Sequence, residues 1–179
     1  LKELLAIPSP TGFTDDAVVY LEGKLAEFPV LNYHRTTKGA LVANWTGDLK
    51  TSLRGLTAHL DTLGAMVKEI KGNGRLKLSQ LGGYVWNTIE GEGCTVFASS
   101  GDPVRGAFLL NKASGHVYGK DVSSTERSAE SMEVLLDIIS TSADETRQAG
   151  IEVGDFVCFD PRIEIQQGFI RSRHLDDKA

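Results

Sequence analysis

The sequence predicts an α/β protein in which a small β-barrel or sandwich follows an opening of helix and strands. Apolar residues recur at helical spacing near the start of the chain, and patterns of period two follow from residue 31. About a hundred residues after Gly64 then consist of short strand-like runs separated by turn residues. Helices are too few to cover both faces of a layered sheet. We therefore expect an α/β layer that this chain leaves incomplete.

The sequence at the start of the chain predicts a helix, a turn, a second helix and two strands. Residues 4–7 end a helical pattern at Pro8, because proline cannot continue a helix and restricts the residue before it. Residues 14–28 form an amphipathic helix, with Thr14, Asp15 or Asp16 available as its cap. The period then changes to two, which predicts strands over 31–35 and 41–45.

The rest of the chain is rich in predicted strands. Ser142 is a candidate helix cap and Gly150 a stop, so a helix of two turns is expected between them. Residues 111–130 are polar and irregular, which favours an exposed loop that orders against a partner. The strands are expected at 65–70, 76–81, 94–98, 105–110, 132–139, 156–160 and 168–172.

Composition narrows the class of partner. The net charge is −5, with 19 basic residues spread along the chain, which argues against nucleic acid and against an anionic membrane surface. No apolar run is long enough to span a bilayer and no secretory leader is present, so we expect a cytoplasmic protein. Cys94 and Cys158 lack metal-type spacing and are expected to be reduced core residues.

A first polar cluster interrupts an apolar run at His59-Leu60-Asp61. Residues i and i+2 of an extended strand share a face, so His59 and Asp61 are expected side by side. A neutral imidazole beside a carboxylate suits a divalent metal, with the carboxylate either ligating or orienting the histidine. The alternative is a histidine at a strand end that a neighbouring aspartate simply satisfies.

A second polar cluster, His174-Leu175-Asp176-Asp177, stands at the end of the sequence. Adjacent residues of a strand face opposite ways, so Asp176 and Asp177 do not form a paired acid and base. One of them can bridge two metals, because a carboxylate has two oxygens. The alternative is a solvated polar loop.

Four ordered motifs together resemble one family. TAHLDTLGAMVKEI, GNGRLKLSQLGGY, AGIEVGDFVCFDP and SRHLDDKA are similar, in order and spacing, to the glutamyl and deblocking aminopeptidases that assemble into tetrahedral shells. The opening LKELLAIPSPTG is similar to the first helix and turn of that family. The resemblance implies a zinc-peptidase α/β catalytic domain interrupted by a β-barrel insertion. Residues 1–62 would begin the catalytic domain, 63–168 would form the barrel used in assembly, and 169–179 would return to the catalytic domain.

The resemblance also implies a site and a reaction. His59 would ligate one of two divalent metal ions, Asp176 would bridge both, and Asp61 would support the site and its activated water. Zinc or cobalt are the expected ions, although these ligands also admit manganese. The implied reaction removes N-terminal residues from peptides. Lys178 stands where the family often has arginine, and Thr62 where an acidic residue is common.

The chain begins without methionine and stops after the second cluster, before the remaining ligands and the general base of that family. We expect an N-terminal part of the enzyme that is inactive alone, belonging to a homo-oligomer of dimers that builds a shell. One alternative is a non-catalytic assembly module that acts through the barrel. A polysaccharide hydrolase such as a glucanase is the least favoured reading, because no separated carboxylate pair is evident.

Overall fold

A computed structural model of the protein describes residues 1–48, 51–52 and 54–179. The chain divides into two compact units, one made of Leu1–Thr62 with Pro161–Ala179 and the other of Leu63–Asp160. Residues 161–168, expected with the barrel, group with the first unit. The assignment of 63–168 to an insertion used in assembly stays a prediction.

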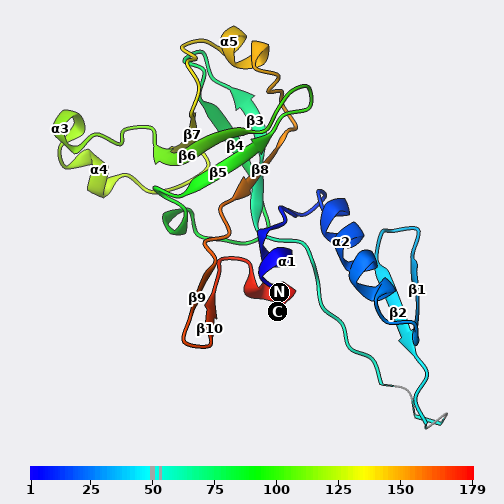
Figure 1. Cartoon of the computed structure of the whole chain (residues 1–179). Coiled ribbons are helices and arrows are strands. Elements are labelled where there is room, and N and C mark those ends of the chain that lie inside the picture. Colours follow the sequence, from blue (N-terminus) through cyan, green and yellow to red (C-terminus); the bar gives the residue numbers. More distant parts are fainter. Residues whose placement is uncertain (49–50, 53) are drawn as a thin grey trace. The chain divides into compact units, whose positions relative to one another are not determined.

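The second unit is a closed barrel of six antiparallel strands (Figure 1). The strands follow the order β3-β4-β7-β6-β5-β8, and β3 closes the barrel by pairing with β8 as well as β4. Of the two architectures that short regular strands allow, the protein therefore adopts the barrel. The strands are β3 (Gly64–Ile70), β4 (Leu76–Leu81), β5 (Gly93–Phe97), β6 (Val104–Leu110), β7 (Met132–Leu136) and β8 (Phe156–Phe159).

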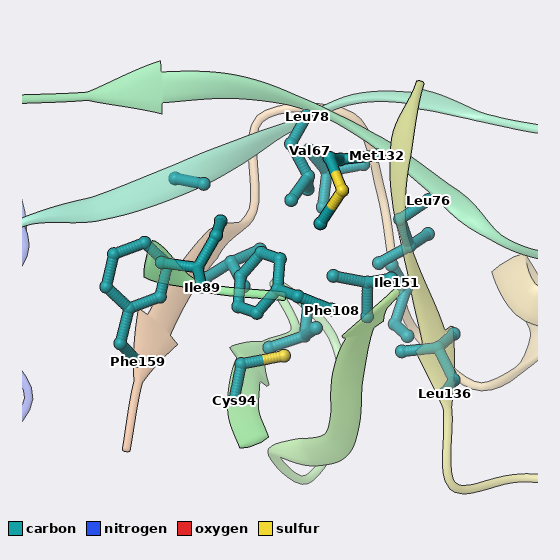
Figure 2. Close-up of a cluster of buried hydrophobic side chains, with 14 of the residues drawn as sticks. Val67, Leu76, Leu78, Ile89, Cys94, Phe108, Met132, Leu136, Ile151 and Phe159 are labelled. Carbon is teal, nitrogen blue, oxygen red and sulfur yellow. The ribbon is translucent and has the colours of Figure 1, made fainter. Parts of the chain in front are cut away.

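Alternate residues of these strands fill the barrel interior (Figure 2). The ring of Phe108 meets that of Phe159 edge to face, with the centroids 5.1 Å apart. Val134, on the neighbouring strand, is fully buried as well. Each such side chain contributes roughly 1.5–3 kcal/mol by leaving water. The barrel therefore has its own core.

Short helices complete this unit. The 3-10 helix η1 (Trp86–Thr88) lies between β4 and β5, and α5 (Ala143–Gln148) lies between β7 and β8. The hydroxyl of Ser142 accepts a hydrogen bond from the Glu145 amide, which confirms Ser142 as the cap. Gly150 has φ of +88°, and a β-carbon there would lie 1.8 Å from the Ser100 carbonyl oxygen. Only glycine fits that stop.

The segment between β6 and β7 is less irregular than expected. It contains two exposed one-turn helices, α3 (Gly115–Tyr118) and α4 (Asp121–Ser124). The sequence did not predict these helices, because each is only four residues long and a polar segment of that length shows no helical spacing of apolar residues. Arg127, near the end of this segment, anchors it by contacting the Glu90 carboxylate at 2.7 Å.

The first unit holds the helices and strands on either side of the barrel sequence. α1 (Lys2–Ala6) and α2 (Asp15–Ala26) match the two expected helices, although Thr14 caps α2 without a side-chain hydrogen bond. Among the described residues its strands form two separate antiparallel pairs, β1–β2 and β9–β10. No helix built from the described residues is long and apolar enough to cross a membrane. The remaining elements are β1 (Leu31–Arg35), β2 (Leu41–Trp45), β9 (Glu164–Gln166), β10 (Phe169–Arg171) and α6 (Leu175–Lys178).

The segment that leads into His59 departs from expectation. We expected an extended strand there, but the described residues 54–61 form no regular strand. A strand needs a neighbour to receive its hydrogen bonds, and none of the described strands pairs with this segment. Among the described residues next to this segment, Thr62 makes an isolated bridge, in parallel with Pro10.

Candidate metal centre

His59 and Asp61 lie side by side, as expected, although not on a strand. The Nδ1 atom of His59 lies 3.0 Å from the backbone oxygen of Asp61 and 3.0 Å from its Oδ1. Thr11 donates a hydrogen bond of 2.6 Å from its hydroxyl to the other carboxylate oxygen of Asp61. Asp61 is therefore held from one side by Thr11 and holds His59 on the other.

Asp176, which is 117 residues away in sequence, meets the opposite edge of the His59 ring. Its Oδ1 lies 3.2 Å from Nε2 of His59. Asp176 belongs to α6, has non-helical backbone angles and precedes a cis peptide bond to Asp177. The structure thus brings together His59, Asp61 and Asp176. Their roles as ligands and catalytic support stay predictions.

The hydrogen-bonding chemistry of this trio favours a cation. Carbonyl and carboxylate oxygens only accept hydrogen bonds, so the His59 ring donates from Nδ1. In the neutral ring Nε2 then carries a lone pair that faces the carboxylate of Asp176. Two acceptors repel each other unless a proton or a metal ion lies between them.

The spacing of the two donor atoms also fits a metal. A tetrahedral zinc ion, roughly 2.0–2.2 Å from a nitrogen and an oxygen ligand, separates those atoms by about 3.4 Å. The separation of 3.2 Å between Nε2 and Oδ1 is close to that value. The Asp61 contact to Nδ1 is the outer hydrogen bond that orients ligating histidines.

The electrostatics of His59 favour a positive charge at the site, whether on the ring itself or on a bound ion. Partial burial lowers its pKa, but the hydrogen bond to the Asp61 backbone and the charges of Asp61 and Asp176 outweigh that effect and leave the pKa raised. The imidazole side chain is 53% exposed and the Asp176 side chain 94% exposed. The site is therefore open to solvent in this chain, and it attracts positive charge.

A cavity of about 650 Å³ adjoins the site within the first unit. It lies between α2, the turn from Lys38 to Leu41, and residues 58–61. Val18, Leu21 and Leu25 of α2 give it an apolar wall. It occupies the space next to the segment that forms no strand.

The second polar cluster is only in part the solvated loop of the alternative interpretation. Asp176 is exposed, whereas His174 and Lys178 are 3% and 6% exposed. Burial, helped by the charge of Lys178, lowers the pKa of His174 to about 4, so its ring is neutral near pH 7. The Lys178 ammonium donates to the backbone oxygens of Leu4 and Ile7.

Sequence reasoning missed the contacts that Thr11 and Lys178 make around the site, and noted Lys178 only as standing where the resembling family often has arginine. A threonine in a Pro-Thr-Gly turn and a lysine beside aspartates are both typical of exposed surface, so neither carried a signal.

Within the part of the chain that the structure describes, no group of three or more His, Cys, Asp or Glu side chains is arranged to hold a metal ion.

Comparison with protein families decides the class. The sequence profile of the M42 glutamyl aminopeptidases matches residues 39–179, which is most of the chain and includes both polar clusters. The chain belongs to the M42 glutamyl aminopeptidase family. The resemblance drawn from the four motifs is therefore confirmed.

A curated relative is similar over the whole chain. The putative aminopeptidase YhfE of Bacillus subtilis is 51% identical over 180 residues, which cover 100% of this chain and 51% of YhfE. The putative aminopeptidase SgcX of Escherichia coli is 27% identical over 88% of this chain and 43% of SgcX. The chain thus spans about half the length of the curated relatives it matches.

Solved structures support the fold. The TET1 peptidase of Pyrococcus horikoshii, described as assembling into a tetrahedron or a large octahedral shell, matches with a TM-score of 0.78. The match covers 99% of this chain and 51% of TET1 at 20% identity. A Thermotoga maritima protein described as an endoglucanase matches with a TM-score of 0.75 at 21% identity, over 98% of this chain and 49% of its own. At these identities the likeness speaks for the fold alone.

Proposed function

We propose that the full-length protein is a dinuclear metal-dependent aminopeptidase, and that this chain supplies His59 and Asp176 as two of its metal ligands. One observation carries the proposal. In a member of the M42 family, Nε2 of His59 and a carboxylate oxygen of Asp176, 117 residues apart in sequence, face each other at 3.2 Å, while the other ring nitrogen of His59 contacts Asp61.

Each residue of the trio has a distinct part in this proposal. His59 binds through Nε2, and Asp61 fixes the tautomer by accepting from Nδ1. Asp176 would hold both ions through the two oxygens of its carboxylate. Zinc or cobalt, when bound, lowers the pKa of a water molecule and polarises the peptide carbonyl. Asp61, which accepts a hydrogen bond from Thr11, would support that water from beside the two ligands.

The remaining ligands and the general base belong, in this proposal, to sequence beyond this chain. The support is the length of YhfE, of which this chain matches 51%, and the order of motifs in the resembling family. The 179-residue chain alone is then inactive. The protein is cytoplasmic in this proposal, acts on peptides, and forms homo-oligomers like those named for the archaeal peptidase.

Two other functions have less support. A purely assembling role for the barrel leaves the arrangement of His59, Asp61 and Asp176 without a purpose. The endoglucanase activity named for the Thermotoga protein is not extended to this chain, because a likeness at 21% identity supports only a common fold.

A chimaera tests the proposal. This chain is joined to the half of YhfE that it does not match, and the product is assayed on a panel of aminoacyl-nitroanilides with zinc or cobalt. We expect turnover that His59→Ala and Asp176→Asn abolish. The matched control is His116→Ala, which removes an exposed histidine of α3 and should leave the rate unchanged.

Two results would contradict the proposal. Undiminished turnover in the His59→Ala chimaera would remove His59 from the site. Turnover by the 179-residue chain alone, lost on His59→Ala, would mean that the centre is complete without the other half. Stable oligomers of the chimaera with neither turnover nor metal uptake would favour the assembly role.

A further inference from the structure

The first eleven residues of the chain contact both polar clusters, and we call Leu1–Thr11 the brace. The contact with the second cluster is made by Lys178, whose ammonium donates hydrogen bonds of 3.1 Å to the Leu4 oxygen and 2.8 Å to the Ile7 oxygen. These oxygens lie in and just after the last turn of α1; the Leu4 oxygen also accepts from the Ile7 amide and uses its second lone pair for Lys178. A buried ammonium needs such acceptors, so this contact is a strong constraint.

The other end of the brace holds the first cluster. The Ser9 hydroxyl donates to the Leu60 oxygen at 2.7 Å, and the Thr62 amide donates to the Ser9 oxygen at 2.8 Å. Thr11 donates to the Asp61 carboxylate. Three hydrogen bonds thus fix residues 60–62, and with them His59, against residues 9–11.

Local secondary structure does not hold either cluster in place against the other. Asp176 lies on a four-residue helix, and a helix of that length is not stable by itself in water. Residues 54–61 form no regular strand. The brace, in contrast, is hydrogen-bonded to both clusters and so connects them.

We propose that Lys178 is a positioning residue: by clamping α6 to the brace, it sets the distance between Asp176 and His59 and so the metal affinity of that pair. This rests on the proposed function, because it takes the pair to be metal ligands. The competing interpretation is that Lys178 stabilises α1 without affecting the site.

A zinc titration of the chain separates these interpretations without an activity assay. The chain has four histidines, so imidazole NMR signals report zinc binding at His59 individually. In Lys178→Met, which keeps the aliphatic stem and removes the donor, we expect the zinc affinity at His59 to fall about tenfold, the lower range for loss of a group that orients a ligand. Lys178→Arg keeps a charged donor and should stay near the unaltered affinity. Lys120→Met removes an exposed lysine and is the matched control.

A second variant covers the case in which Lys178→Met does not fold. Thr11→Val keeps the shape of the side chain but removes the hydrogen bond to Asp61 at the other end of the brace. It should also weaken zinc binding, by up to about tenfold. Circular dichroism identifies which variants are folded.

The outcomes distinguish this proposal from the one beneath it. The positioning role alone would be overturned by a folded Lys178→Met chain that binds zinc as tightly as the unaltered chain. If Lys178→Met does not fold, unchanged zinc affinity in Thr11→Val would overturn it instead. A zinc titration that leaves the His59 signals of the unaltered chain unmoved would overturn the positioning role in this chain, whereas the proposed function is decided separately by the assay of the chimaera.

Discussion

The seam between β4 and β7 gives the sharpest test of the barrel. Leu76 of β4 pairs with Val134 of β7, and within the described part of the chain this one residue pair joins the two strands. On its other side Val134 pairs with Phe108 of β6, and its side chain is fully buried. Val134→Ala therefore removes two methyl groups from the interior where the barrel is least secured.

The expected loss follows from burial. Each buried carbon contributes about 0.8 kcal/mol, so two contribute about 1.6 kcal/mol. The space left behind adds about 24 cal/mol per Å³ of cavity that does not collapse. We expect the free energy of unfolding of the barrel to fall by about 2–3 kcal/mol. Val153→Ala, the same substitution at a side chain 59% exposed in the same unit, should cost no more than about 0.5 kcal/mol.

Tryptophan fluorescence in a urea titration measures this loss. Trp86 is buried in the barrel unit, whereas Trp45 is 77% exposed in the first unit. In a Trp45→Phe background the emission of Trp86 reports the barrel alone. Equal losses in Val134→Ala and Val153→Ala, or a loss below about 1 kcal/mol in the former, would refute the reasoning about the seam.

Two further predictions concern the barrel. Burial raises the pKa of Cys94 to about 12, and both cysteines are buried, so neither thiol should react with a disulfide reagent at pH 8 until urea unfolds the chain; rapid labelling in the folded state would contradict this. The hydrogen bonds from Arg105 lower the pKa of Asp160 below its ordinary 3.8. The ionised carboxylate therefore stabilises the fold at pH values above 3.8. This contribution is lost as the pH falls through the pKa of Asp160 in the folded state. Asp160→Asn should therefore lose less stability than the unaltered chain on acidification from pH 5 to pH 3, and an equal loss would show that the pair contributes nothing.

Local signals explain why much of the fold was predictable. The helix between Ser142 and Gly150 is encoded by its own cap and stop, and both act within one turn of the chain. The alternation of Val134, Leu136 and Ile138 predicted that they share one face. Val134 and Leu136 are buried in β7, whereas Ile138 lies beyond the end of that strand and is only partly buried against the core. Turn residues between such runs were enough to predict short, regular strands.

Long-range partners explain the rest. The segment ending at His59 has the pattern of a strand, but a strand forms only where another offers its backbone groups. The local sequence predicts a surface position for Lys178. The side chain is nevertheless buried, because carbonyl oxygens more than 170 positions earlier accept hydrogen bonds from its ammonium group. No pattern within a short window carries that information.

The candidate site divides in the same way. The proximity of His59 and Asp61 follows from their spacing, and they lie 3.0 Å apart. The approach of Asp176 was expected only through the family resemblance, because 117 residues separate it from His59. Thr11 was missed since its contact depends on how the opening turn meets residues 60–62.

Anomalous diffraction at the zinc edge, from crystals of the chimaera grown with zinc, tests the central claim most directly. The account predicts a zinc peak that lies within about 2.0–2.2 Å of both Nε2 of His59 and a carboxylate oxygen of Asp176, with Asp61 still on Nδ1. A zinc ion bound elsewhere, with His59 and Asp176 making no contact to metal, would contradict it.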